Sequence, residues 1–148
     1  WGHKQETTET WFGMFLKTGE KTPMVDAMHR IWTGAEPEHR SPMITGLHSS
    51  LREKVADAAS VHEVEVTYTN LDKGPLQFEW SVIAETHDRR SGGDVEATPP
   101  TIPGCVVENN GDRARIQLPD TSGAYRVFIF LRDAHGGGSA ANFPFYVA

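Results

Sequence analysis

Residues 120–132 read DTSGAYRVFIFLR and carry the strongest strand signal in the chain. A polar turn leads into a tyrosine and then into a run rich in β-branched and aromatic residues, which is the composition that favours extended strands. The alternation places Tyr125, Val127, Ile129 and Leu131 on one face. The number of residues between the turn and Tyr125 is typical of a tyrosine corner, in which the phenol donates a hydrogen bond to the backbone of the preceding turn. We therefore expect a buried strand whose start is held by that bond.

Most of the chain from residue 42 onward has the same period of two. Residues 61–68 (VHEVEVTY) place Val64 and Val66 on one face and glutamates on the other, and residues 76–83 (LQFEWSVI) alternate in the same way. Further strands are expected at residues 43–47, 104–107, 113–118, 125–132 and 142–147. Short turns separate these segments and no helix alternates with them, so the sequence predicts a mainly β, antiparallel two-sheet sandwich rather than a parallel sheet.

Trp80 favours one kind of sandwich. It lies in mid-strand about 45 residues before Tyr125, where an immunoglobulin-like sandwich places its core tryptophan. The only cysteine, Cys105, rules out an intrachain disulfide and is expected to be a small buried residue. The sandwich should therefore be held by apolar packing alone.

The first 41 residues have a helical pattern instead. A first helix is expected within residues 6–19, with an apolar face of Trp11, Phe12, Phe15 and Leu16. The second is better marked, because Thr22 is a good N-cap, Pro23 suits the first helical position and Gly34 suits the end. Its apolar residues are expected to form a buried face and are Met24, Val25, Met28, Ile31 and Trp32. Residues 35–42 (AEPEHRSP) are expected to be a linker or a chain crossover.

Length and charge exclude several classes of protein. The 148 residues suit one domain with an appendage. A formal net charge of −6 disfavours binding to nucleic acid or to anionic lipid. The sequence has no apolar run of membrane-spanning length and no signal peptide, and its start at Trp1 rather than Met predicts a piece of a longer protein.

Two stretches carry a resemblance to known families. From Pro42 onward, TNLDKGPLQFEWSV and SGAYRVFIFLRDAHGGGSAANFPFYV are similar to the polycystic-kidney-disease (PKD)-like or immunoglobulin-like modules of bacterial secreted and surface proteins. Residues 1–34, WGHKQETTETWFGMFLKTGEKTPMVDAMHRIWTG, resemble the end of a glycoside hydrolase (β/α)8 barrel. The resemblance divides the chain into a helical segment with a linker (1–41) and an immunoglobulin/PKD-like β-sandwich (42–148).

The resemblance also implies a function and a location. Such modules follow the catalytic barrel of bacterial polysaccharide-degrading enzymes outside the cell or in the periplasm, and they bind carbohydrate or brace the barrel. The partner would be a polysaccharide or the parent barrel. The alternative is a structural or protein-interaction spacer of a secreted or surface protein, with no ligand.

No catalytic centre, metal site or cofactor site is expected in this chain alone. Glycosidases need two carboxylates about 5–10 Å apart, whereas Glu63, Glu65 and Glu79 have the parity of solvent-facing strand residues. Residues 135–138 (HGGG) match the oxyanion-hole tetrapeptide of lipases, but no Gly-x-Ser-x-Gly elbow accompanies them, so they are interpreted as a hairpin turn. The turn at residues 70–74 (NLDKG) has fewer carboxylates than the acidic turn of the family that it resembles, and it has gained a lysine, so the resemblance does not imply a calcium site here.

Carbohydrate recognition is the more promising chemistry, because aromatic rings stack on sugars and polar groups orient them. The outward parity of residues 125–132 carries two phenylalanines between two arginines, an exposed pattern typical of an interaction site. Three explanations remain open: the two N-terminal helices cover this face, it docks onto the barrel, or it is a sugar platform. The candidate binding residues are Trp1, Trp11, Phe128, Phe130, Tyr146, Arg126 and Arg132.

Overall fold

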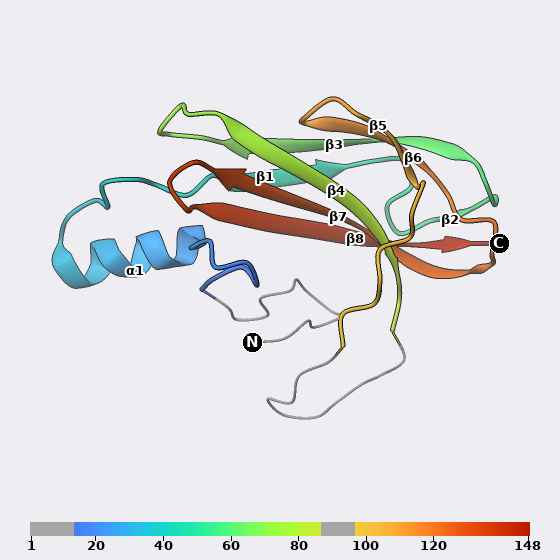
Figure 1. The fold of residues 1–148 in the computed structure, drawn as a ribbon, viewed down its shortest axis with the longest axis horizontal. Helices are drawn as coiled ribbons and strands as arrows, with labels where there is room; N and C mark the ends of the chain where they lie inside the picture. The colour runs from blue at the N-terminus through green and yellow to red at the C-terminus, as the bar shows by residue number, and fades with distance from the viewer. Residues whose placement is uncertain (1–13, 87–96) are drawn as a thin grey trace.

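The computed structural model describes residues 14–86 and 97–148, which fold mainly into β-strands. Within these residues two four-stranded sheets pack against each other (Figure 1). One has the order β1 (Met43–His48), β3 (Val61–Thr69), β6 (Arg113–Gln117), β5 (Val106–Asn109). The other has the order β2 (Val55–Ala56), β8 (Gly138–Val147), β7 (Gly123–Asp133), β4 (Leu76–Ala84). Neighbouring strands are antiparallel except β2 and β8, which are parallel.

The seven predicted strands are all present. The largest shift is at β8, which begins at Gly138 instead of residue 142. Strand β2 was not predicted, because two residues are too few to show alternation. The mainly β, two-sheet prediction is therefore confirmed.

The core lies between the sheets and follows the predicted parity. Val64 and Val66 of β3 meet Val127 and Ile129 of β7, and all four are almost fully buried. Burial of each such side chain contributes about 1.5–3 kcal/mol to folding. Trp80 is also buried, and its indole N–H donates a hydrogen bond of 2.9 Å to the carbonyl oxygen of Gly111.

The corner before β7 forms as predicted. The Tyr125 hydroxyl donates to the carbonyl oxygen of Thr121 at 2.8 Å, and the ring stacks on Phe145. Cys105 is buried as expected, and desolvation raises the pKa of its thiol. The Tyr125 hydrogen bond and ring stacking therefore fix the start of β7 against the core.

The predicted second helix is present as α1 (Pro23–Thr33). Thr22 occupies the N-cap, Pro23 the first turn and Gly34 the C-cap, where it takes φ 73° and donates its N–H to Arg30. The predicted burial of its apolar face is wrong, because no residue of α1 is buried, and Ile31 and Trp32 are 74% and 73% exposed. Figure 1 shows the reason: α1 lies beyond the ends of the strands, where no sheet covers it. It is not a helix that could cross a membrane.

The predicted first helix is not confirmed. Residues 6–13 of that prediction lie outside the described residues, and residues 14–19 are not helical. Instead the chain turns back, with the N–H of Gly19 bonded to the carbonyl oxygen of Leu16 and with Phe15 paired to Lys21 in a β-bridge. The turn needs Gly19, whose φ is 104°.

Candidate docking site

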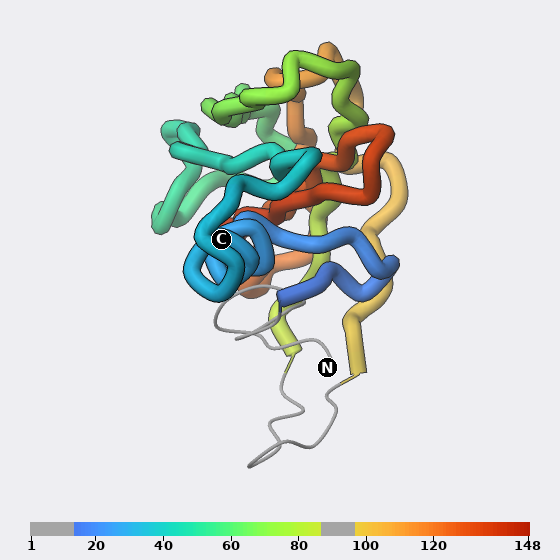
Figure 2. The backbone as a smooth tube through the Cα atoms, turned by 90° about the vertical axis from the view of Figure 1, so that its left-hand side faces the viewer, coloured from blue at the N-terminus to red at the C-terminus, as the bar shows by residue number. Residues whose placement is uncertain are grey.

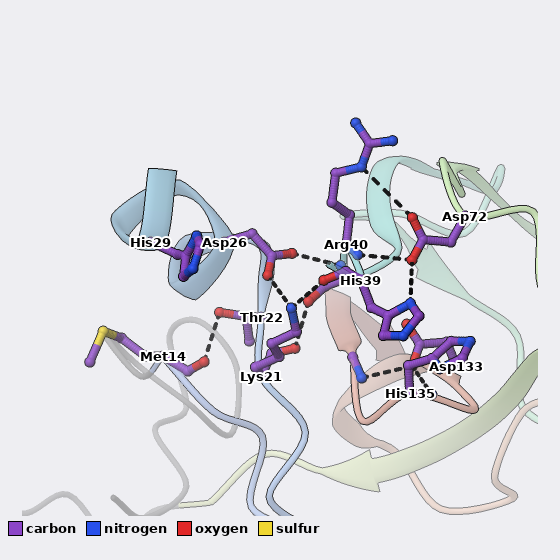
Figure 3. Close-up of polar contacts among 12 residues, drawn as sticks. Met14, Lys21, Thr22, Asp26, His29, His39, Arg40, Asp72, Asp133 and His135 are labelled. Atoms are coloured by element: carbon purple, nitrogen blue, oxygen red, sulfur yellow. Dashed lines mark hydrogen bonds and ion pairs between the residues drawn. The ribbon is translucent and has the colours of Figure 1, made fainter. Parts of the chain in front are cut away.

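The chain on both sides of α1 is fastened to the sandwich by a polar network that joins the segment before the helix, the linker after it and two turns of the sandwich (Figure 3). We call this network the linker clamp. Its members are Lys21, Asp26, His39, Arg40, Ser41, Asp72 and the β7–β8 turn at residues 133–138.

The centre of the linker clamp is an ion pair between Lys21 and Asp26, the acidic residue in the first turn of α1. The Lys21 ammonium lies 2.5 Å from Asp26 Oδ1 and donates to the carbonyl oxygen of His39. Asp26 Oδ2 accepts the N–H of Ser41 at 2.6 Å. Both side chains are largely buried and their hydrogen bonds are charge-assisted, so the geometry of the ion pair is well defined. The pair connects the start of α1 to the end of the linker.

The backbone of Lys21 pairs with the β7–β8 turn. Its N–H donates to the carbonyl oxygen of Gly136 at 2.9 Å, and its own carbonyl oxygen accepts the N–H of Gly138 at 2.8 Å. Figure 2 shows the blue segment before α1 passing next to the red β7–β8 hairpin. The predicted hairpin turn is thus confirmed, and it also holds the N-terminal segment.

At two positions of this turn the structure requires glycine rather than another residue. Gly136 takes φ 79°, a conformation that side chains disfavour. At Gly137 a Cβ would lie 2.9 Å from Ser41 Cα and 2.5 Å from an Asp133 carboxylate oxygen. Asp133 in turn accepts the N–H of Gly137 at 2.7 Å. The linker can approach the hairpin only because residue 137 has no side chain.

The turn between β3 and β4 holds the linker through Asp72. Its Oδ2 accepts the backbone N–H of Arg40 at 2.9 Å and lies 3.4 Å from Nδ1 of His39. The Arg40 N–H, aided by the His39 and Arg40 side chains, lowers the pKa of the Asp72 carboxyl below its ordinary value. The His39 ring also stacks on His135 with 3.7 Å between centroids. The acidic turn thus binds the chain's own linker.

Because the linker clamp holds both ends of the α1 segment, the helix presents a defined surface. Met24, Ile31 and Trp32 are all exposed, and spacings of seven and eight residues place them on one side of a helix. We call these three side chains the α1 stripe. Exposed apolar side chains on one side of a helix form a candidate interaction surface.

The outer face of β7 differs from the predicted sugar platform. Phe128 and Phe130 are 2% and 7% exposed, and they form a second apolar cluster with Leu16, Ile83 and the partly buried Ala140. Leu16 of the N-terminal segment packs on these rings. The expected cover by two helices is not found among the described residues, because residues 14–19 are not helical and Phe15 and Trp32 remain exposed. The two rings are not available for stacking on a sugar in this structure.

The two arginines of that face have internal partners. Arg126 donates to Asn142 Oδ1 at 2.6 Å and forms an ion pair with Glu85. Arg132 lies 3.1 Å from Glu20 and 2.5 Å from Glu79, and its guanidinium lies over the Phe130 ring. The Arg132–Glu20 contact holds the N-terminal segment on the sheet.

The pKa of Glu20 shows that its carboxylate is held in this arrangement. Partial burial raises the pKa of the Glu20 carboxyl. Hydrogen bonds from Thr18 and from the Glu20 backbone, together with the Arg132 guanidinium, lower it by more, so the pKa lies below its ordinary value.

Of the remaining candidates, only Tyr146 is among the described residues, and it does not join this group. Tyr146 is exposed and lies four residues beyond Asn142 on β8, which is roughly 13 Å along a strand. Trp1 and Trp11 lie outside the described residues. Across residues 14–86 and 97–148 no three His, Cys, Asp or Glu side chains gather as metal ligands would.

Comparison with protein-family models gives no match, and comparison with curated proteins gives none either. The geometry of the linker clamp and of the α1 stripe therefore carries the functional argument.

Proposed function

We propose that this chain is a non-catalytic accessory module of a bacterial polysaccharide-degrading glycoside hydrolase, acting outside the cell or in the periplasm, and that it braces the catalytic barrel. The observation that carries the proposal is the α1 stripe, which the linker clamp holds exposed beside the sandwich. An apolar helix face in a set orientation suits a permanent neighbour better than a soluble ligand.

The strand order supports an immunoglobulin/PKD-like assignment. The order β1-β3-β6-β5 corresponds to strands A-B-E-D of an immunoglobulin sandwich, and β4-β7-β8 corresponds to C-F-G. Buried Trp80 and the Tyr125 hydrogen bond occupy the places that such domains give to a core tryptophan and a tyrosine corner.

The resemblance of residues 1–34 to the end of a (β/α)8 barrel suggests that barrel as the neighbour. A module on a flexible tether would need no contacts between linker and sandwich, whereas here His39, Arg40 and Ser41 all use backbone groups in the linker clamp. Bracing is favoured over a sugar platform because Phe128 and Phe130 are buried.

The test compares one variant in two proteins. Ile31→Ser combined with Trp32→Ser is made in this chain and in the full-length glycosidase, and unfolding is followed by calorimetry. Both side chains are exposed here, so the change should leave the chain's Tm nearly unaltered. In the enzyme it should lower the Tm and separate the transitions of module and barrel. Val55→Ser, at an exposed apolar position of β2, is the control. A variant that is silent in both proteins contradicts the brace and favours a spacer.

A further inference from the structure

A polar groove of about 540 Å³ lies on the outer face of the β1-β3-β6-β5 sheet, away from the linker clamp. Its lining includes the buried Val64 and Ala114, charged side chains of β3, β5 and β6, and residues 47–50 and 52. We call it the charged groove. Its volume is in the range of small-molecule sites, roughly 300–1,000 Å³.

Carboxylates and guanidiniums alternate across this face. In the strand register Glu65 is opposite Arg113 and Glu63 is opposite Arg115, which in turn is opposite Glu108. The Arg113–Glu65 pair is 2.9 Å apart and the Arg115–Glu108 pair 3.7 Å. Among the described residues, none forms a hydrogen bond or ion pair with the carboxylate of Glu63, so it is available to a bound molecule.

Both ends of the groove are already ordered by hydrogen bonds. At one end the Ser49 hydroxyl donates to the carbonyl oxygen of Glu63 at 2.7 Å and accepts the N–H of Leu51. At the other end Asn110 Nδ2 donates to Glu108 Oε1 at 2.7 Å. A preformed site loses less conformational freedom when a ligand binds.

The charges select the class of ligand. Glu63, Glu65 and Glu108 would repel an anion, and Arg52, Arg113 and Arg115 would repel a cation. A neutral molecule with neighbouring hydroxyls can donate to a carboxylate and accept from the adjacent guanidinium, and both bonds are charge-assisted. None of the described lining residues carries a phenyl, phenol or indole ring, so recognition would depend on hydroxyls rather than on stacking.

We infer that the charged groove binds a neutral oligosaccharide through paired hydroxyl contacts to Glu63 and Arg115. The charges of the groove select a neutral polyol, and the statement that this polyol is a saccharide rests on the proposed function. The groove uses no residue of the linker clamp or the α1 stripe, so the two proposals succeed or fail separately.

The test is an NMR titration of the ¹⁵N-labelled chain with cellohexaose, xylohexaose, mannohexaose and laminarihexaose, with tetragalacturonate and a glucosamine tetramer as charged probes. We expect one neutral hexasaccharide to shift the backbone amides of residues 63–65 and 113–115 saturably. The charged probes should bind more weakly. Glu63→Gln and Arg115→Gln should each weaken binding about tenfold, the loss of one charge-assisted hydrogen bond.

Matched controls are Glu38→Gln and Arg30→Gln, which remove the same charges at exposed sites outside the groove. Three results would overturn the inference: no shift in the groove with any neutral hexasaccharide, shifts that both groove variants retain in full, or tighter binding of a charged probe. The calorimetric test of the brace has a different readout, so a failed titration leaves that test intact.

Discussion

At Gly137 the linker and the sandwich lie too close together to leave room for a side chain. Only 2.9 Å separates the site of its absent Cβ from Ser41 Cα, and backbone cannot move aside as a flexible side chain can. Gly137→Ala should therefore lower the free energy of unfolding by about 1–3 kcal/mol, the usual cost of overpacking. Chemical denaturation measures it.

Gly74→Ala is the control for this change, because a Cβ there meets nothing within 4 Å. If Gly137→Ala is as stable as Gly74→Ala, the close approach of linker and hairpin is not part of the fold.

The lowered pKa of the Asp72 carboxyl predicts how the linker clamp responds to acid. Its folded pKa is lowered from the ordinary value of 3.8, chiefly by the Arg40 N–H, so its contribution is present above that value and is lost as the pH falls through the lower folded pKa. The wild-type free energy of unfolding should therefore decline below about pH 4. Asp72→Asn should be less stable at neutral pH and decline less in acid.

Unfolding titrations between neutral pH and pH 2.5 make this comparison. Asp120→Asn removes one carboxylate at an exposed position outside the linker clamp. An Asp72→Asn profile parallel to that of the wild type would show that Asp72 does not hold the linker.

At the scale of elements, the Tyr125 hydroxyl connects the start of β7 to the turn before it. Tyr125→Phe keeps the ring in the core and removes the hydrogen bond to Thr121, so it should cost about 0.5–1.5 kcal/mol in the free energy of unfolding. Tyr68→Phe, on a half-exposed ring of β3, should change stability by less than about 0.5 kcal/mol. Equal losses in the two variants would mean that the corner bond contributes nothing.

The cover of the outer sheet face can be tested at two adjacent residues. Leu16 is buried against Phe128 and Phe130, whereas Phe15 beside it is 45% exposed. Leu16→Ala should lower the free energy of unfolding by about 2–4 kcal/mol, and Phe15→Ala should cost much less. Similar small losses would show that the N-terminal segment does not cover this face in solution.

Helix α1 and most of the strands could be predicted because their sequence signals are local. Alternation in β3, β4 and β7 identified the strands and their inward faces, and Thr22, Pro23 and Gly34 gave the bounds of α1. The burial of α1 could not be predicted in this way. Helical periodicity shows which face is apolar but not whether anything lies against it.

The linker clamp was beyond prediction for a related reason. Asp72 is 32 residues from Arg40, and Asp26 is 15 residues from Ser41. Neither contact leaves a periodic trace, since each depends on how two turns meet in space. The one sequence signal was the glycine-rich stretch after His135, which indicated a turn but not the segment that the turn holds.

At the scale of the whole molecule, the outer face of one sheet is used for internal packing and that of the other is left open. The β2-β8-β7-β4 sheet carries Leu16 and the N-terminal segment, while the β1-β3-β6-β5 sheet carries the charged groove. Helix α1, which carries the α1 stripe, lies at one end of the sandwich (Figure 1). This arrangement leaves exposed the two surfaces for which we propose a neighbouring domain and a polar ligand.

The central claim is that the linker clamp holds α1 in one orientation, and a distance distribution between α1 and the sandwich tests it most directly. Spin labels at His29→Cys in α1 and Gln117→Cys in β6, with Cys105→Ala to remove the native thiol, report that distance by pulsed electron paramagnetic resonance. We predict one narrow distribution that broadens when Lys21→Met breaks the linker clamp. A broad distribution with the clamp intact would contradict the account.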